Sequence, residues 1–537
     1  MAIKDSIYKL RSEAHLSQAK FAAICSVSSQ SVQKWESGAS EPTLDKLILI
    51  ARRFGVSLDA LVMSRDGRSI EAITAGGKLR PHYEHLHNWE LYSASLREEF
   101  RQCTDEGLDV SAYADVFEAV SRMPVGEARE DMADVLFRLV QGAPVRPDFP
   151  YEEPSTLEEI RLRSHPVTLT GSRPDDETFF RKVYGAWVGR VAGCVAGKSV
   201  EGMRTNELVP LLKMTNNYPM HRYIRRADFT EEDVAGFTYD VAHTPYPDRF
   251  DGVTPPDDDT NYTVMASELI ERYGRDFVPA DVAHLWLDSQ KKDAYCTAER
   301  VAFCNFVRGY EPPASAIYKN PFREWIGAQI RADYFGYINP GNPSLAAEMA
   351  FRDASISHVK NGIYGEMFVA AMLAAAAVSD DMHEIIAAGL GEIPTTSRLH
   401  EAVSGIVSLY DGGAPREEAF RRIHTMYDEY TNDGWCHTIP NAMIVVACLL
   451  YGGENFGRSI GMAVETGFDT DCNGATVGSI LGMKNTIAVI GEEWRAPLCD
   501  TLRTDIHGVP VVSLTEMARR TIDHVGNFAK SPTPRKP

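Results

Sequence analysis

Hydrophobic residues recur every three or four positions along most of this chain, and that spacing predicts helices. The pattern is clear over residues 83–141, and apolar runs rich in alanine, such as 370–378 and 442–450, also indicate helices. Alternating runs of the kind that form strands are few. The pattern therefore predicts an all-α protein.

The first 66 residues contain four or five short predicted helices around one compact core. Ser17 and Ser28 are suited to N-cap two of them, Gly38 to end the second, and Pro42 to precede a third. The side chains that this arrangement buries are Leu10, Phe21, Ala22, Val27, Val32, Trp35, Leu47, Ile50, Ala51 and Leu61. Residues 1–66 are therefore expected to form a small helical domain, with Gln30, Gln33 and Lys34 outside the core.

The rest of the chain divides by composition. Residues 67–142 are predicted to be a helical connecting region, serving as a spacer, a dimer element or a layer against the following domain. Six prolines between Pro144 and Pro174 predict an extended segment over 143–175. Residues 176–526 form the largest expected domain, and residues 527–537 a disordered tail.

Composition limits the classes of function. A chain of 537 residues is too long for one ordinary core, and nine cysteines without a Cys-x-x-Cys pair indicate reduced thiols. The longest apolar runs are too short to span a membrane, and no signal segment opens the chain, so we expect a cytoplasmic protein. The net charge is −20, yet residues 1–64 are slightly positive, so any contact with nucleic acid is expected there.

Two acidic turns, far apart in the sequence, each precede a predicted helix. Asp257, Asp258 and Asp259 lie before residues 263–273, and Asp469 and Asp471 lie before residues 475–483. A helix start favours negative charge, and two such turns facing each other could hold two Mg²⁺ or Mn²⁺ ions. A lone aspartate more often caps a helix, but three in a row repel one another unless something neutralises them.

Together with glycines at positions 185, 189, 193 and 197, these motifs resemble the ADP-ribosylglycohydrolase family over about residues 176–526. The resemblance implies an all-α domain with a binuclear Mg²⁺ or Mn²⁺ site that hydrolyses a glycosidic bond of an ADP-ribosyl or related nucleoside-derived substrate. It implies Glu201 and Asp258 as catalytic residues. The implied metal ligands are Asp257, Asp258, Asp259, Asp469, Asp471 and Cys472, and the implied substrate-binding residues are Glu201, Asn342, His358, Asn361, Gly467 and Asn473.

Four positions depart from the family's usual pattern. Cys194 stands where Asp is usual, Asp257 where Thr or Ser is usual, and Cys472 where a hydroxyl residue is usual, while Pro343 removes a donor from a ligand loop. Sulfur is a poor partner for Mg²⁺, so Cys472 either faces away or favours Mn²⁺. These departures keep open a regulator that senses an ADP-ribose-like or nucleoside ligand without turnover.

Residues 1–66 resemble the XRE-type helix-turn-helix, with five helices. The resemblance implies that Ser29, Gln30, Gln33 and Lys34 lie on the recognition helix in the major groove of operator DNA, and that Gln18 holds the DNA backbone. Such a module reads one half-site, so a homodimer is expected. The alternative is a helical module that docks another protein.

Overall fold

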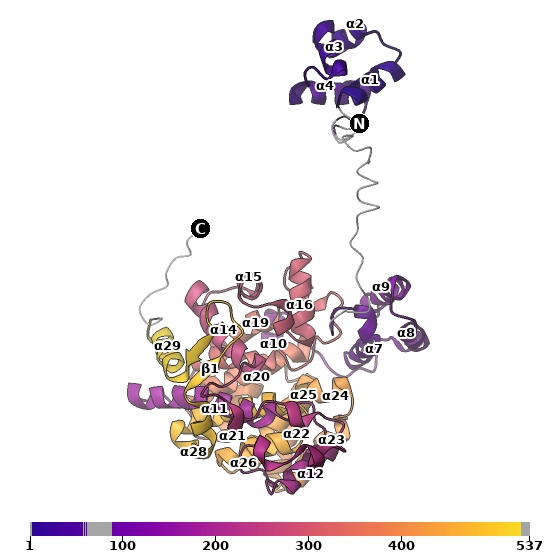
Figure 1. Ribbon diagram of the computed structural model, residues 1–537. Helices are drawn as coiled ribbons and strands as arrows, with labels where there is room; N and C mark the ends of the chain where they lie inside the picture. Colours follow the sequence, from indigo (N-terminus) through magenta and orange to yellow (C-terminus); the bar gives the residue numbers. More distant parts are fainter. Residues whose placement is uncertain (1–2, 57, 59–60, 62–87, 528–537) are drawn as a thin grey trace. The chain divides into compact units, whose positions relative to one another are not determined.

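The computed structural model describes residues 3–56, 58, 61 and 88–527, and its chain divides into two compact units between Leu86 and His87 (Figure 1). Both are helical, as the hydrophobic pattern predicts. The described part of the chain has only two short strands, β1 (Thr501–Arg503) and β2 (Val511–Ser513), which pair antiparallel with Leu502 opposite Val512.

The N-terminal unit contains α1 (Ile3–Glu13), α2 (Gln18–Ile24), α3 (Ser29–Ser37) and α4 (Leu44–Phe54). Ser17 and Ser28 accept backbone N–H groups as the predicted N-caps, and Gly38 ends α3 in the left-handed region at φ +78°. Most of the predicted core side chains are buried together. The expected fifth helix falls on residues 57–61, mostly outside the described residues, although Leu61 packs into this core.

The large unit begins with three helices that form a small core of their own: α7 (Leu96–Asp105), α8 (Ala114–Ser121) and α9 (Glu127–Gln141). Buried ion pairs join α7 to the rest of the unit, because Arg323 binds Glu99 (3.1 Å) and Glu106 (2.6 Å). These helices therefore form a layer packed on the following domain.

The remaining helices belong to the body of the large unit, and α11, α14 and α27 place its acidic residues (Figure 1). They are α10 (Leu157–Arg163), α11 (Asp176–Lys198), α12 (Thr205–Met214), α13 (Glu231–Val234), α14 (Asp258–Tyr273), α15 (Pro279–Ser289), α16 (Thr297–Val307), α17 (Ala314–Ile317), α18 (Asp333–Tyr337), α19 (Pro343–Ala354), α20 (Lys360–Ala376), α21 (Met382–Gly391), α22 (Arg398–Asp411), α23 (Arg416–Met426), α24 (Asn432–Cys436), α25 (Thr438–Tyr451), α26 (Phe456–Glu465), α27 (Thr470–Asn485), α28 (Glu492–Arg495) and α29 (Leu514–Asn527).

Helix α10 lies inside the segment predicted to be extended. No proline interrupts residues 155–165, Thr156 caps the helix by accepting the N–H of Glu159, and Ile160 is buried. A local cap and one buried side chain are enough to form two helical turns between the prolines.

Helices α11 and α27 approach so closely that their backbones touch along a line of glycines. A Cβ atom built on Gly189 would lie 2.2 Å from the carbonyl oxygen of Gly478, and one on Gly193 would lie 1.9 Å from that of Gly474. Glycines every four residues place one glycine face along a helix and so predict that another helix packs closely against it. Helix α27 is that partner, and the prediction is confirmed. This contact fixes the end of α11 against the start of α27.

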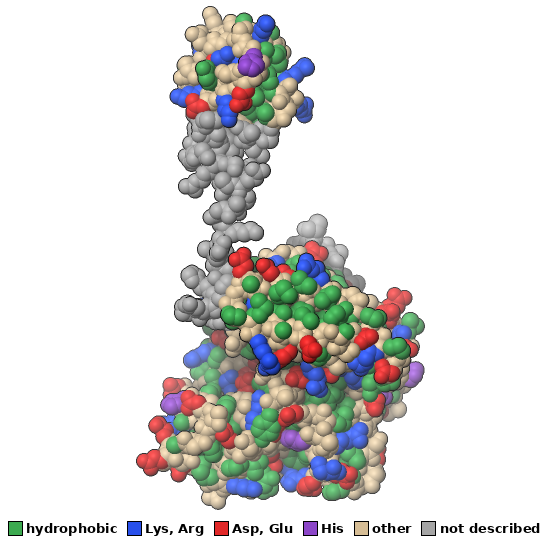
Figure 2. All heavy atoms as spheres, turned by 90° about the vertical axis from the view of Figure 1, so that its right-hand side faces the viewer, with side chains coloured by type: hydrophobic (Ala, Val, Ile, Leu, Met, Phe, Trp, Pro, Cys, Tyr) green, Lys and Arg blue, Asp and Glu red, His purple; other side chains and the backbone are tan. Residues whose placement is uncertain are grey.

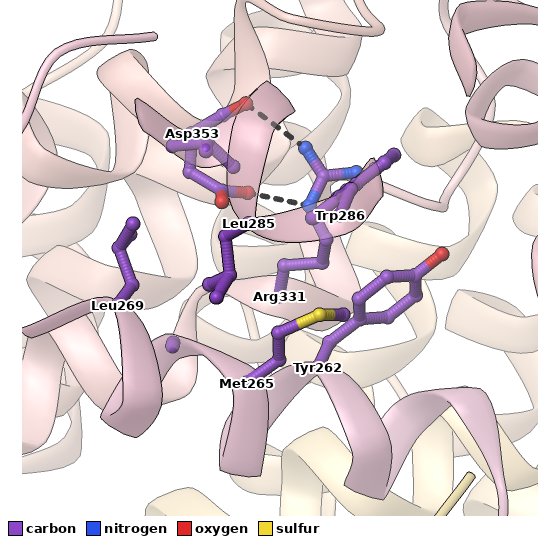
Figure 3. Close-up of a pocket in the computed structure, with 9 residues that line it drawn as sticks. Tyr262, Met265, Leu269, Leu285, Trp286, Arg331 and Asp353 are labelled. Carbon is purple, nitrogen blue, oxygen red and sulfur yellow. Dashed lines mark hydrogen bonds and ion pairs between the residues drawn. The ribbon is translucent and has the colours of Figure 1, made fainter. Parts of the chain in front are cut away.

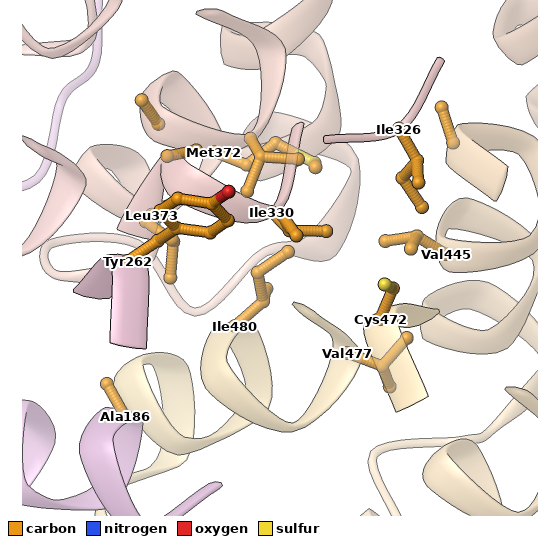
Figure 4. Packing of buried hydrophobic residues seen from close by; sticks show 14 of the residues in the cluster. Ala186, Tyr262, Ile326, Ile330, Met372, Leu373, Val445, Cys472, Val477 and Ile480 are labelled. Atoms are coloured by element: carbon orange, nitrogen blue, oxygen red, sulfur yellow. The ribbon is translucent and has the colours of Figure 1, made fainter. Parts of the chain in front are cut away.

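The core around this pair is apolar. Figure 4 shows Cys472, Val477 and Ile480 of α27 beside Val445 of α25 and Ile326. Among the described residues, no helix has both the length and the apolar character needed to cross a membrane.

Candidate active site

Two helix starts bring the acidic residues together, and they do so in the same way. Asp257 is the N-cap of α14 and Asp469 that of α27, while Asp259 and Asp471 each stand two residues further on, in the first turn. The side chain of Asp257 accepts the N–H of Asp259 at 3.0 Å. Both helices direct unpaired N–H groups and the positive end of the helix dipole toward this centre, which favours negative charge there.

The carboxylates form two overlapping sets of possible metal ligands. In the first set, ligand atoms of Cys194, Asp257, Asp259 and Asp471 all lie within 4.8 Å of one another, and the second set consists of Asp469, Asp471 and Cys472 under the same limit. All of these residues are buried, and Asp471 belongs to both sets. Two sets that share a carboxylate fit a pair of ions.

Three of the buried carboxylate oxygens have no hydrogen-bond partner among the described residues: Asp259 Oδ2, Asp469 Oδ1 and Asp471 Oδ1. A buried unpaired carboxylate oxygen is costly, and a bound cation removes that cost. The donor atoms present therefore fit divalent cations, and Asp257, Asp259, Asp469 and Asp471 would hold them.

Two basic side chains partly neutralise the centre. Lys198, in the last turn of α11, forms an ion pair with Asp257. Arg190 is fully buried and binds Asp259 Oδ1 at 2.9 Å and Asp333 Oδ2 at 2.8 Å. The sequence contains no local signal for this role of Arg190, because its partners lie 69 and 143 residues away.

The pKa values of the carboxyl groups show how crowded the negative charge is. Burial, together with the charge of Asp257, raises the pKa of Asp471 to about 6. Burial followed by neighbouring carboxylates raises the pKa values of Asp258, Asp259 and Asp469 well above their usual range. Asp257 differs: burial opposes its charge, but Lys198 lowers its pKa below the usual value. Protons or cations must therefore compensate this centre.

Glu201 and Asp258 are the accessible members of the acidic group. Glu201 lies in the turn after α11 and is exposed, and Asp258 is partly exposed, whereas the other four carboxylates are buried. The negative charge of neighbouring carboxylates, above all Asp471, raises the pKa of Glu201 well above that of a free glutamate. The structure thus separates four enclosed candidate ligands from two carboxyl groups that a substrate can reach.

Aromatic and basic side chains lie beside the same centre. The guanidinium of Arg204 lies 4.8 Å from the ring centre of Trp435, and burial lowers the pKa of Arg204. Tyr239 approaches Gly202, directly after Glu201. The thiol of Cys436 lies 3.9 Å from Asp469 Oδ2. Arg204 and Tyr239 come from loops, whereas Trp435 and Cys436 lie in the short helix α24.

Asn473 and Gly467 support the start of α27. The side-chain amide of Asn473 donates to Asn441 Oδ1 at 2.8 Å, and the same oxygen accepts the N–H of Asp469 at 3.4 Å. Gly467 has φ +72°, and a Cβ atom there would lie 2.3 Å from Glu429 Oε2. Both predicted residues therefore lie beside the acidic turn, where Asn441 acts as a shared acceptor.

The other predicted substrate residues have different surroundings. Asn342 is the exposed N-cap of α19 and accepts the N–H of Leu345. Asn361 is buried, and its amide donates to Glu153 and Glu324 at 2.8 Å each. His358 is buried, bonds to Ser357 at 2.8 Å and lies 4.0 Å from Glu299. The described contacts of these three residues do not include the acidic centre, and their role in substrate binding stays a prediction.

The sequence of residues 325–333 predicts a helix, but this prediction is wrong for the first part, which is a turn followed by a single 3₁₀ turn at Gln329–Arg331. The N–H of Ile326 bonds to Cys436 at 2.8 Å, and Gly327 packs against Glu299, so tertiary contacts replace helical bonds. Figure 3 shows Arg331 of this segment held by Asp353 beside Tyr262 and Trp286. Arg331 is thus part of a buried ion-pair network.

In the N-terminal unit, α3 presents the predicted DNA-contacting side chains. Ser29, Gln30, Gln33 and Lys34 are exposed, whereas Val32 and Trp35 of the same helix are buried. Gln18 is half-buried and donates to Glu36 Oε2 at 2.7 Å, so its amide orients α2 against α3. The arrangement leaves one polar face of α3 free of the core.

The fold and the two carboxylate sets define an all-helical protein of the glycohydrolase type, joined to a helix-turn-helix unit. The chain belongs to the ADP-ribosylglycohydrolase family, whose model matches residues 175–525, and residues 7–61 match the helix-turn-helix model. No curated protein matches the chain. A solved "ADP-ribosylglycohydrolase-related protein complex" is similar at 16% identity and a TM-score of 0.39, covering 65% of this chain and 99% of that one.

Proposed function

We propose that the large unit is a hydrolase that uses two Mg²⁺ or Mn²⁺ ions to cleave a glycosidic bond of an ADP-ribosyl or related nucleoside-derived substrate. The observation that carries the proposal is the division of the acidic group. Three buried carboxylate oxygens without partners suit metal ions, and two accessible carboxyl groups suit proton transfer. When bound, the ions would supply charge stabilisation and orient ribose hydroxyls and a water.

The accessible carboxyl groups would then manage protons. Because its pKa is raised, Glu201 holds a proton more readily than a free glutamate and can exchange it with a water or a leaving group. Asp258 stands at the first turn of α14, where it can position the same water or accept its proton. Two carboxyl groups on either side of a glycosidic bond support an oxocarbenium-like transition state. Arg204 and Trp435 would form a wall for the nucleotide part of the substrate.

Metal binding is the first test of this function. We expect millimolar Mn²⁺ or Mg²⁺ to raise the melting temperature of the metal-free chain, because a ligand selective for the folded state stabilises it. Asp471→Asn should abolish most of the rise, since Asp471 belongs to both ligand sets. Asp411→Asn, in α22 away from both sets, is the control and should respond like the wild type. Calorimetry that shows no binding of either ion would contradict the two-metal proposal.

The second candidate function is a sensor that binds an ADP-ribose-like or nucleoside ligand without turnover. Cys194 and Cys472 favour it, because thiols replace oxygen donors in both ligand sets. A sensor would bind the ligand in the presence of metal but release no product from an ADP-ribosylated substrate or a nucleoside. Release of free ADP-ribose from an ADP-ribosylated protein distinguishes the hydrolase from the sensor.

We further propose that residues 1–66 read operator DNA through α3, in a cytoplasmic homodimer. One helix-turn-helix reads one half-site, and useful affinity comes from two copies on half-sites about one DNA turn apart. The exposed face of α3 with Gln33 and Lys34 supports the contact with bases and phosphates.

The outer face of α9 is the surface we propose for dimerisation. Met132, Val135 and Leu139 are 39%, 39% and 38% exposed and follow one stripe of the helix, while the neighbouring stripe enters the core. Figure 2 shows hydrophobic side chains gathered on this face of the large unit. The first turns of α9 are acidic and Arg138 lies in its last turn, so two antiparallel copies would place opposite charges together.

Val135→Asp should therefore convert the dimer to a monomer and weaken binding to a two-half-site operator at least ~10-fold, because a buried unpaired charge at the interface is costly. Light scattering and fluorescence anisotropy measure the two effects. Val307→Asp, at a side chain that is 70% exposed, is the matched control and should remain dimeric. Gln33→Ala should stay dimeric but lose sequence preference. A wild-type chain that is monomeric at micromolar concentration would rule out this surface.

A further inference from the structure

Two thiols lie among the carboxylates of the acidic centre. Cys194 belongs to the set with Asp257, Asp259 and Asp471, and Cys472 to the set with Asp469 and Asp471. Cys194 and Cys472 are 1% and 6% exposed, and both are free. Their positions are fixed, because Cys194 follows Gly193, which touches the backbone of Gly474 in the first turns of α27.

The carboxylates around these thiols include oxygens without partners: one on Asp259, one on Asp469 and one on Asp471. The first set thus offers one sulfur and three carboxylates, and the second offers one sulfur and two carboxylates. Four donors are the number found in closed zinc sites, and three donors plus an open position are the number found in catalytic ones. A sulfur in each set disfavours Mg²⁺, which prefers oxygen ligands only.

We propose that Cys194 and Cys472 are metal ligands, and that they make this centre select a thiophilic divalent cation of the zinc and cobalt class over Mg²⁺. The proposal rests on the proposed metal-binding function of the same site and revises its ion, because two sulfur ligands favour Zn²⁺ or Co²⁺ over the Mg²⁺ of that function. Each thiol gives up its proton when its sulfur binds the ion, so binding releases protons to the solvent. In the first set the ion competes with Lys198 for Asp257.

Cobalt absorption tests the proposal directly. Titrating the metal-free, full-length chain with Co²⁺ should produce a near-ultraviolet sulfur-to-cobalt charge-transfer band and release protons. Excess Zn²⁺ should erase the band, whereas excess Mg²⁺ should leave it. Cys194→Ser and Cys472→Ser should each weaken Co²⁺ binding at least ~10-fold and reduce the band. Loss of a side chain that only hydrogen-bonds to a ligand already lowers metal affinity by about 10-fold or more, and loss of a ligand lowers it further. Cys499→Ser, at an exposed thiol, is the matched control and should leave the band unchanged.

The possible results distinguish a failure of the two thiols as ligands from a failure of metal binding itself. If Co²⁺ or Mn²⁺ raises the melting temperature of the wild type without a charge-transfer band, the thiols are not ligands, and the metal-dependent hydrolase still stands. If none of Co²⁺, Zn²⁺, Mn²⁺ and Mg²⁺ binds, both proposals fail. The charge-transfer band of the wild type shows whether a thiol binds the ion even if a serine variant does not fold.

Discussion

Glu201→Gln should lower the rate of glycosidic-bond hydrolysis at least ~100-fold, because general acid–base groups contribute about that much or more. The substitution keeps the shape of the side chain and removes its ability to exchange a proton. Metal binding should persist, since neither buried ligand set contains Glu201. Turnover measured with metal present, together with calorimetry for the metal and for ADP-ribose, checks both halves of the expectation.

Glu158→Gln, at an exposed position in the first turn of α10, is the control and should keep wild-type activity. A fully active Glu201→Gln variant would contradict the role of Glu201 and transfer proton handling to Asp258. A variant that loses ADP-ribose binding along with activity would instead make Glu201 a substrate-binding residue.

Gly189→Ala should destabilise the large unit by about 3 kcal/mol or more, at the upper end of what overpacking costs. The added Cβ atom would lie 2.2 Å from the carbonyl oxygen of Gly478, and backbone on both sides prevents an easy shift. Because α11 and α27 carry or position most of the acidic centre, separating them should also weaken metal binding. Denaturant unfolding followed by circular dichroism measures the change.

Gly526→Ala is the matched control, since Gly526 is also helical but meets nothing within 4 Å. That variant should be unchanged or slightly more stable, because alanine favours a helix over glycine by up to about 1 kcal/mol. Equal stability of the two variants would show that the close contact between α11 and α27 does not determine the stability of the unit.

Local chemistry made much of this fold predictable. Ser17 and Ser28 have side chains typical of N-caps, and each directly precedes an apolar helical run. The turns at Asp257 and Asp469 also precede helices. The four-residue glycine spacing of α11 predicts a closely packed neighbouring helix, and that helix is α27. Each of these signals is contained within about one helix turn of sequence.

The features that the sequence did not predict depend instead on contacts between segments far apart in the chain. Residues 325–328 have helical periodicity, but the bond from Ile326 to Cys436 and the packing of Gly327 on Glu299 override it. Arg190 enters the centre only because α14 folds back over α11. The caps and bridges that Asn342 and Asn361 form are likewise tertiary or local contacts that spacing does not reveal. Their predicted role in substrate binding stays a prediction.

Release of free ADP-ribose is the measurement that tests the central proposal most directly. The full-length chain should be incubated with ADP-ribosylated protein and Mn²⁺ or Mg²⁺, and with the same mixture after chelation. We expect ADP-ribose to accumulate with metal, to stop on chelation and to fall at least ~100-fold with Glu201→Gln. Tight, metal-dependent binding of ADP-ribose without any release from ADP-ribosylated protein or nucleosides would contradict the hydrolase and favour the sensor.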